Sequence, residues 1–183
     1  MLLSLTIICV CGGGILACVN ELTREPIEKA KKRKLENAIK EVVPEFDNSP
    51  SEEAYYGKIN EGDSLKIYPA KKNEQLVGVA VESNSMKGFN GEIKIIVGFD
   101  AEGKIINYTV LQHTETPGLG DKMKLWFKTN NNRQNILGKN LSLGELNVSK
   151  NGGDVDAITA ATISSRAFLD AVNRAYVACR GRK

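Results

Sequence analysis

The hydrophobic and polar positions divide the chain into an uncharged N-terminal stretch, a charged helical stretch and a longer mixed region. Residues 2–19, LLSLTIICVCGGGILACV, contain no charged side chain. As a helix they would span about 27 Å, close to the thickness of the hydrocarbon core of a bilayer. The pattern therefore predicts one transmembrane helix within residues 1–22. A cleaved signal peptide and a lipoprotein signal ending at Cys18 are the alternatives, although no Lys or Arg precedes the apolar stretch.

A second helix is expected over residues 23–44 as a connector. Pro26 suits the first turn of a helix, and Pro44 ends the pattern. Between them, apolar residues recur at helical spacing among charged ones. The basic run at residues 31–34 is expected to face solvent or lipid headgroups. The apolar positions are Ile27, Ala30, Leu35, Ala38, Ile39, Val42 and Val43.

Residues 45–183 carry the pattern of one folded domain. Residues 45–69 mix turns with short elements. Three later stretches alternate apolar and polar residues or are rich in β-branched residues, as strands are, and a turn at Asp100–Gly103 joins the last two into a hairpin. These predicted strands are residues 76–81, 92–99 and 104–111.

The C-terminal part of the domain is predicted to be mostly helix and loop. A short helix is expected at residues 123–127 and a polar surface loop at residues 128–139. An amphipathic helix, capped by Ser164 or Ser165, ends the chain. The whole pattern predicts an α+β fold, an antiparallel sheet with flanking helices preceded by one transmembrane helix.

Composition narrows the classes of function. A content of 42% hydrophobic and 26% charged residues is that of an ordinary globular protein. The net charge of +3 is too small to indicate a nucleic-acid partner. With a single His, and with Cys179 as the one cysteine beyond the apolar stretch, the sequence offers neither a metal site nor an internal disulfide.

The segment Asp156-Ala-Ile-Thr-Ala-Ala-Thr162 lies directly before the predicted last helix. Its small residues leave the backbone accessible where unpaired N–H groups and the positive end of the helix dipole favour an anion such as phosphate. Arg166, in the first turn, is a candidate for a further contact with that anion. Ordinary helix capping by the Thr and Ser hydroxyls is the simpler alternative.

This segment closely resembles the flavinylation motif Asp-x-x-(Ser/Thr)-Gly-Ala-Thr. That motif belongs to the FMN-binding domain found in one subunit, the G subunit, of the Rnf electron-transport complex and in the C subunit of the sodium-pumping NADH:quinone oxidoreductase. The blocks Gly88-Phe-Asn-Gly91 and Glu115-Thr-Pro-Gly-Leu-Gly120 also resemble that family.

The resemblance implies that Thr162 carries covalent FMN. In the family, a flavin transferase that uses FAD esterifies the last Thr of the motif with the FMN phosphate. Asp156, Thr159, Ala160 and Ala161 occupy the remaining motif positions assigned to the cofactor site. Ala160 departs from the usual Gly, and its methyl group is tolerable if its φ angle is negative.

The same resemblance places the loop after the predicted hairpin beside the isoalloxazine ring. It implies that Glu115, Thr116, Gly118 and Leu119 lie close to the ring, since Pro117 fixes the turn and the glycines let the backbone approach. A rigid connection without a ligand is the alternative.

Four other residues are candidates for lesser roles. His113 is expected to hydrogen-bond its neighbours, Trp126 and Phe127 to belong to the core, and Lys150 to be solvated. None of them is assigned to catalysis, and no general base or nucleophilic triad is apparent.

The function implied by the resemblance is electron relay. The other membrane subunits of the Rnf complex would couple ferredoxin–NAD electron transfer to ion pumping. The chain would be a single-pass protein of the bacterial inner membrane, in contact with lipid. Its folded domain would lie on the periplasmic side, although the basic run after the apolar stretch favours the cytoplasm by the positive-inside rule. The missing basic leader makes Met1 an expected internal start.

Two other functions stay open. One is a membrane-tethered binding or assembly module that holds flavin noncovalently or not at all. The other is an independent flavin reductase, which the sequence disfavours because it contains no Gly-rich dinucleotide-binding fingerprint.

Overall fold

The computed structural model describes residues 2–60 and 63–181, except for the side chains of residues 2, 4, 5 and 8. The chain divides into two compact units, Met1–Asn37 and Ala38–Lys183. The first consists of most of one long helix, and the second contains the sheet and the remaining helices.

Helix α1, Leu2–Val42, is continuous through Pro26. The predicted helix of residues 1–22 and the predicted connector helix of residues 23–44 are thus joined in one helix. A proline removes one hydrogen bond from the helix, and two ion pairs between residues one turn apart, Arg24–Glu28 and Glu25–Lys29, span it here. These pairs and the surrounding helix-forming residues support the helical backbone across the proline.

Across the described residues, no helix combines the length and the apolar character needed to cross a bilayer. The predicted transmembrane segment includes residue 1 and the side chains of residues 2, 4, 5 and 8, which lie outside the described part of the chain. The described side chains between residues 3 and 34 are all exposed.

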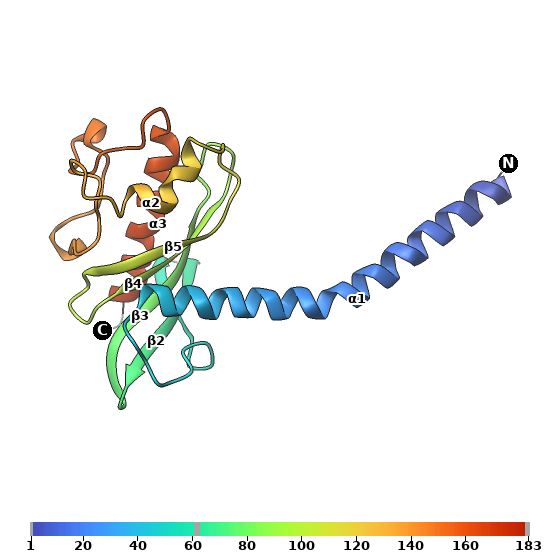
Figure 1. Ribbon diagram of the computed structural model, residues 1–183, viewed down its shortest axis with the longest axis horizontal. Helices are drawn as coiled ribbons and strands as arrows, with labels where there is room; N and C mark the ends of the chain where they lie inside the picture. The colour runs from blue at the N-terminus through green and yellow to red at the C-terminus, as the bar shows by residue number, and fades with distance from the viewer. Residues whose placement is uncertain (1, 61–62, 182–183) are drawn as a thin grey trace. The chain divides into compact units, whose positions relative to one another are not determined.

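A five-stranded antiparallel sheet forms the centre of the second unit (Figure 1). The strands pair in the order of the sequence, each with the next. This confirms the predicted α+β fold with an antiparallel sheet, and β3, β4 and β5 lie where strands were predicted. The strands are β1 (Tyr55–Asn60), β2 (Asp63–Lys72), β3 (Gln75–Ser85), β4 (Ile93–Phe99) and β5 (Ile105–His113).

Strands β1 and β2 fall in a region predicted to hold only turns and short elements. Pro69 lies within β2, and a proline argues against a central strand because it cannot donate a ladder hydrogen bond. The register resolves the conflict. Pairing of β2 with β1 ends at Ile67, so Pro69 has a strand neighbour only on the β3 side, where it faces Val79. At this position β2 is locally an edge strand, which tolerates proline.

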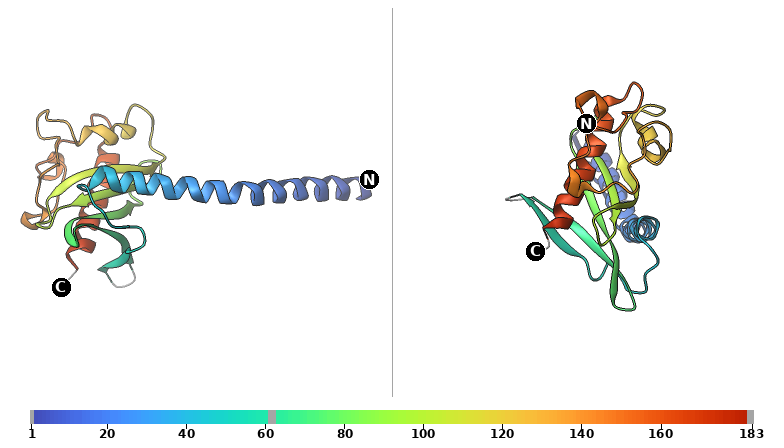
Figure 2. Two further views of the ribbon diagram at one scale, coloured as in Figure 1. Left: turned by 60° about the horizontal axis from the view of Figure 1, so that its bottom comes forward. Right: turned by 90° about the vertical axis from the view of Figure 1, so that its left-hand side faces the viewer.

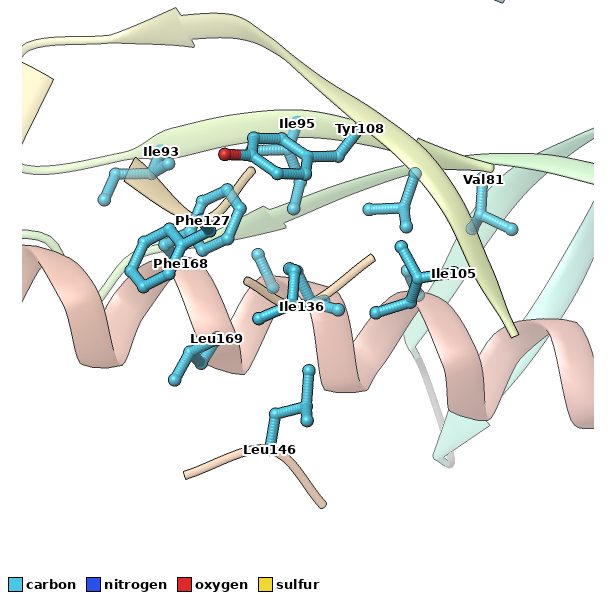
Figure 3. Close-up of a cluster of buried hydrophobic side chains, with 14 of the residues drawn as sticks. Val81, Ile93, Ile95, Ile105, Tyr108, Phe127, Ile136, Leu146, Phe168 and Leu169 are labelled. Carbon is cyan, nitrogen blue, oxygen red and sulfur yellow. The ribbon is translucent and has the colours of Figure 1, made fainter. Parts of the chain in front are cut away.

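Helix α3, Thr162–Arg180, covers one face of the sheet and buries the main core (Figures 2 and 3). It packs mainly against β3 and β4, and the Ser83 hydroxyl donates to the carbonyl of Ala171 at 2.7 Å. The rings of Phe127 and Phe168 stack with centroids 4.6 Å apart. The predictions of an amphipathic C-terminal helix and of Phe127 in the core are confirmed.

The opposite face of the sheet is covered in part by the last turn of α1. Ala38, Ile39 and Val42 are buried there. An added Cβ at Gly98 would lie 1.7 Å from the carbonyl oxygen of Val42. Strand β4 can therefore pass this close to the end of α1 only because residue 98 is a glycine. The end of α1 thus belongs to the folded unit that contains the sheet.

The segment between β5 and α3 is built from short turns. It contains the 3₁₀ turn η1 (Gly120–Lys122) followed by α2 (Met123–Trp126), which confirms the predicted short helix. The loop at residues 128–139 is less superficial than predicted, since Gln134 and Ile136 are buried. Two further 3₁₀ turns, η2 (Leu141–Leu143) and η3 (Ser149–Asn151), lead to the start of α3.

Candidate functional site

The two segments singled out in the sequence meet at one pocket of about 330 Å³. A volume of this size lies within the range of small-molecule sites. Its walls come from the loop after β3, the loop after β5 and the start of α3. The lining residues are Phe89, Glu115, Thr116, Leu119, Gly120, Ala160, Ala161, Thr162, Ile163 and Ser164.

Thr162 is the first residue of α3. The preceding residue, Ala161, has φ −135° and provides no side-chain cap, so the N–H groups of residues 162–164 have no acceptor within the helix. Thr162 is half-buried, and among the described residues none forms a hydrogen bond with its hydroxyl. Its hydroxyl is therefore not used as a cap, and it borders a pocket at the positive end of a helix dipole.

The prediction that Ser164 or Ser165 caps α3 is wrong. Both residues lie inside the first turn and are buried. The Ser165 hydroxyl accepts from the Ile158 N–H and donates to the Ala161 carbonyl, each at 2.9 Å. It therefore ties the loop before the helix to the helix itself.

Glu115 holds the pocket together from inside. Its side chain is buried, with 4% of the residue exposed. One carboxylate oxygen accepts from the Asn90 N–H at 3.0 Å, and the other accepts a short hydrogen bond from the Ser164 hydroxyl. One carboxylate thus joins the loop after β3, the loop after β5 and the start of α3.

Two glycines make room for that carboxylate. A Cβ at Gly88 would lie 2.7 Å from Glu115 Oε1 and 2.2 Å from the Gly91 carbonyl oxygen. A Cβ at Gly120 would lie 2.8 Å from Glu115 Oε2 and 2.6 Å from the Ser164 hydroxyl. The Gly88–Gly91 and Glu115–Gly120 blocks, which also resemble the family, therefore meet at one buried side chain, that of Glu115.

Ala160 adopts a left-handed backbone, with φ +62°. The condition of a negative φ, under which its methyl group would be tolerable, is not met. A non-glycine residue in this region is strained, by about 1 kcal/mol or more. The position therefore favours the glycine of the family motif, and the alanine found here retains local strain directly before Thr162.

Apolar side chains form the rim of the pocket. Phe89 is 65% exposed, Ile163 47% and Leu119 40%. Of these three rim residues, Leu119 alone was assigned to the site from the sequence. Four residues of the pocket walls were not predicted: Phe89, Gly120, Ile163 and Ser164. The Gly88–Gly91 block was recognised as part of the family pattern, and an exposed aromatic residue between two glycines was the available signal for Phe89.

Three residues of the expected site do not line the pocket. Gly118 has φ +76° and supplies the turn of its loop, and Thr159 is exposed on the loop before α3. Asp156 lies further back along that loop. Its carboxylate accepts from the Arg133 N–H at 3.2 Å and pairs with the Arg133 guanidinium at 3.4 Å.

The contacts of Asp156 change the pKa of its side chain. Its pKa is lowered, chiefly by the hydrogen bond from the Arg133 backbone N–H. The main chain of Asp156 is also fixed, because its carbonyl accepts from the Trp126 indole at 2.9 Å. Asp156 therefore positions the loop that leads to Thr162 without touching the pocket. Trp126, partly buried against the core, is the residue that connects this loop to α2.

The remaining candidates lie away from the pocket walls. Arg166 is exposed and donates to Asn151 at 2.7 Å. Lys150 is exposed, as expected for a solvated side chain. His113 is the last residue of β5, and the prediction that it bonds its neighbours fails at Nδ1, which is buried without a partner among the described residues.

The pocket has the chemical features that FMN requires. Unpaired helix N–H groups and the dipole favour a phosphate beside the Thr162 hydroxyl. Apolar side chains and the backbone of the Glu115 loop offer a surface for a planar ring, with Thr116 as a polar neighbour. FMN bound here would supply the redox chemistry, while the residues of the chain bind it, orient it and limit its contact with water.

Comparison with known proteins agrees with this chemistry. The FMN-binding domain family matches residues 88–177, which include all the pocket walls. The G subunit of the ion-translocating oxidoreductase complex of Vibrio vulnificus (strain YJ016) is 35% identical over 182 residues, covering 93% of this chain and 83% of that protein.

Two further relatives carry the same name. The protein of Photorhabdus laumondii is 34% identical over 169 residues, covering 88% of this chain and 80% of the relative. The protein of Shewanella amazonensis is 31% identical over 172 residues, covering 88% and 79%. The pocket at the start of α3 thus lies within an FMN-binding domain, and the chain belongs to the family of G subunits of Rnf-type ion-translocating oxidoreductase complexes.

Proposed function

We propose that the chain is an electron-transfer subunit of an ion-translocating oxidoreductase complex and carries FMN as a phosphoester on Thr162. The observation that carries the proposal is the position of the Thr162 hydroxyl. It borders the pocket at the first residue of α3 and is not engaged by another described residue. The Asp156–Thr162 motif and the family of the chain support the same assignment.

The attachment step is a phosphoryl transfer. The Thr162 oxygen forms a bond to the FMN phosphorus of FAD, and the bond between that phosphorus and the bridging oxygen of AMP breaks. AMP leaves with the bridging oxygen, and the hydroxyl proton passes to solvent or to a base of the flavin transferase. The chain contributes the acceptor hydroxyl and the helix N-terminus that stabilises phosphate charge.

Electron relay follows from tethering the flavin at an accessible pocket. The exposed rim residues Phe89, Leu119 and Ile163 leave an edge of the site open to a partner. The ester retains the cofactor without tight equilibrium binding, so electrons can enter and leave at one fixed point. The partners are the other membrane subunits of the complex, together with the flavin transferase during maturation.

The N-terminal part of α1 is the proposed membrane anchor. The proposal rests on the eighteen uncharged residues 2–19 and on relatives named as subunits of an ion-translocating complex. Residues 1–22 would lie in the inner membrane in contact with lipid, residues 23–44 would connect, and residues 45–183 would bind FMN on the periplasmic side.

Replacing Thr162 tests the function. The full chain, coexpressed with a flavin transferase, is expected to show flavin fluorescence in a denaturing gel and a mass increase of one FMN less one water. Thr162→Ala abolishes both. Thr129→Ala is the control, because the Thr129 hydroxyl bonds the Leu125 carbonyl and lies outside both the motif and the pocket walls. Retained fluorescence in the Thr162 variant would exclude attachment at this hydroxyl and show a covalent bond elsewhere in the chain. A parent protein without gel fluorescence would favour a module that holds flavin noncovalently or not at all.

A further inference from the structure

The charge inside the pocket is unusual for a phosphate site. Of the described residues that line it, Glu115 alone has an ionisable side chain. Arg166, in the first turn of α3, donates instead to Asn151, and Lys87, beside the Gly88–Gly91 block, pairs with Asp170 at 2.7 Å. Attraction for an anion therefore rests on the helix N-terminus, with no cation in the described walls and with one carboxylate.

That carboxylate is close to the unpaired N–H groups. Glu115 accepts from the hydroxyl of Ser164, the third residue of α3, whose own N–H has no acceptor within the helix. The residue is 4% exposed, so water screens its charge poorly. A phosphate brought to this helix end is stabilised by the dipole and repelled by Glu115.

Attraction by the helix end and repulsion by Glu115 both grow with the charge of the phosphate, so Glu115 offsets part of the gain from each added charge. A phosphate monoester such as that of free FMN carries a charge of about −1.5 to −2 at pH 7. A phosphodiester, which is what the proposed ester creates, keeps a single negative charge. Repulsion by a nearby carboxylate grows in proportion to the ligand's charge, so Glu115 penalises the monoester more than the diester.

We infer that Glu115 is a specificity residue that lowers the affinity of the pocket for free FMN more than its affinity for esterified FMN. This rests on the proposed function and adds the ligand form that the site selects. A protein that exchanged free FMN with its surroundings would compete with its own attachment reaction. The buried carboxylate reduces this competition, because it offsets part of the attraction between the helix N-terminus and the phosphate of unattached FMN.

The test measures binding of three ligands that differ in charge to full-length Thr162→Ala protein, which cannot form the ester. The ligands are riboflavin, which is neutral, the methyl phosphodiester of FMN, and FMN itself. In the Thr162→Ala protein, FMN is expected to bind no more than about ten times tighter than the methyl diester, because Glu115 offsets most of the gain from the second negative charge. In the Thr162→Ala/Glu115→Gln double variant, FMN binding strengthens by about 10-fold, while riboflavin binding changes less than about 2-fold.

Each outcome either supports the inference or overturns it. Equal effects of Glu115→Gln on all three ligands would show a structural role and overturn it, as would no FMN binding to the double variant. If that variant does not fold, the Thr162→Ala protein still decides, because FMN binding more than about ten times tighter than binding of the methyl diester contradicts repulsion. Attachment at Thr162 is scored separately by gel fluorescence, so either proposal can fail while the other stands.

Discussion

The two loops that converge on the pocket each contain a carboxylate, and the two carboxylates act from opposite sides. Glu115 is buried inside the loop after β5 and joins three segments through its two oxygens. The Asp156 side chain, 28% exposed, holds the loop before α3 from outside by contacts with Arg133. The inner carboxylate fixes the shape of the pocket and its charge, whereas the outer one fixes only the approach of the backbone to Thr162.

The loops also differ in backbone conformation. In the loop after β5 the left-handed position is a glycine, Gly118, which tolerates it without strain. In the loop before α3 the left-handed position is Ala160. Buried side chains hold both loops by hydrogen bonds, Glu115 in the first and Ser165 in the second. The comparison indicates that the first loop is relaxed and that the second is strained at Ala160.

Removing the inner carboxylate should have the largest effect. Glu115→Ala leaves the Asn90 N–H and the Ser164 hydroxyl without their acceptor and opens a cavity. We expect the free energy of unfolding to fall by about 2–4 kcal/mol, measured by urea denaturation of the full chain. Glu115→Gln keeps the volume and one acceptor oxygen and should cost less. A loss below about 0.5 kcal/mol for the alanine variant would show that the carboxylate does not organise the pocket.

Relieving the strain in the second loop should have a smaller effect of opposite sign. Ala160→Gly should raise the free energy of unfolding by about 0.5–1.5 kcal/mol, since glycine adopts a positive φ without the penalty of a Cβ. Ala161→Gly is the adjacent control, because φ at Ala161 is −135°, so glycine there relieves no strain, adds flexibility to the unfolded chain and removes a buried methyl group. Thermal unfolding of the two variants side by side measures the difference. Equal destabilisation by both would refute the strain at Ala160.

Replacing the outer carboxylate, Asp156, should give the smallest effect on stability, and that effect should depend on pH. The pKa of Asp156 is lowered from 3.8 in the folded protein, so its ionised form favours folding above that value. The contribution is lost as the pH falls through the lowered pKa. Asp156→Asn should therefore melt below the parent protein at pH 6, and the gap should narrow below about pH 3.8 and close once the pH has passed the lowered pKa. A gap that persists in acid would assign the effect of the substitution to packing instead of charge.

The sequence predicts the fold best where one side of an element is buried. Strands β3 to β5 and helix α3 show their periodicity because alternate residues, or one helical stripe, pack into a single core. Strand β2 escaped prediction because Pro69 suggests a break, and only the register of its neighbours shows that the position lacks a partner on one side. The continuity of α1 through Pro26 was likewise decided by the residues around the proline.

The site was predicted in part for a similar reason. Glu115, Thr116, Leu119 and Thr162 are recognisable from local motifs, and the structure brings them to one pocket. The roles of Ser164 and Gly120 depend on contact with Glu115, across 49 residues in the case of Ser164, which a local pattern does not encode. The positive φ of Ala160 was hidden because alanine, unlike glycine, gives no sign of a left-handed backbone.

The buried last turn of α1 has a consequence for dissecting the protein. Because Val42 covers Gly98, and Ile39 is buried beside it in the same turn, a fragment that begins after Pro44 would uncover an apolar surface on β4. Exposed sheet surface of this kind promotes self-association. A fragment that starts upstream of Ala38 keeps the helix turn that covers β4 and should remain monomeric in solution. A fragment that starts at residue 45, where the domain pattern begins, should precipitate or self-associate.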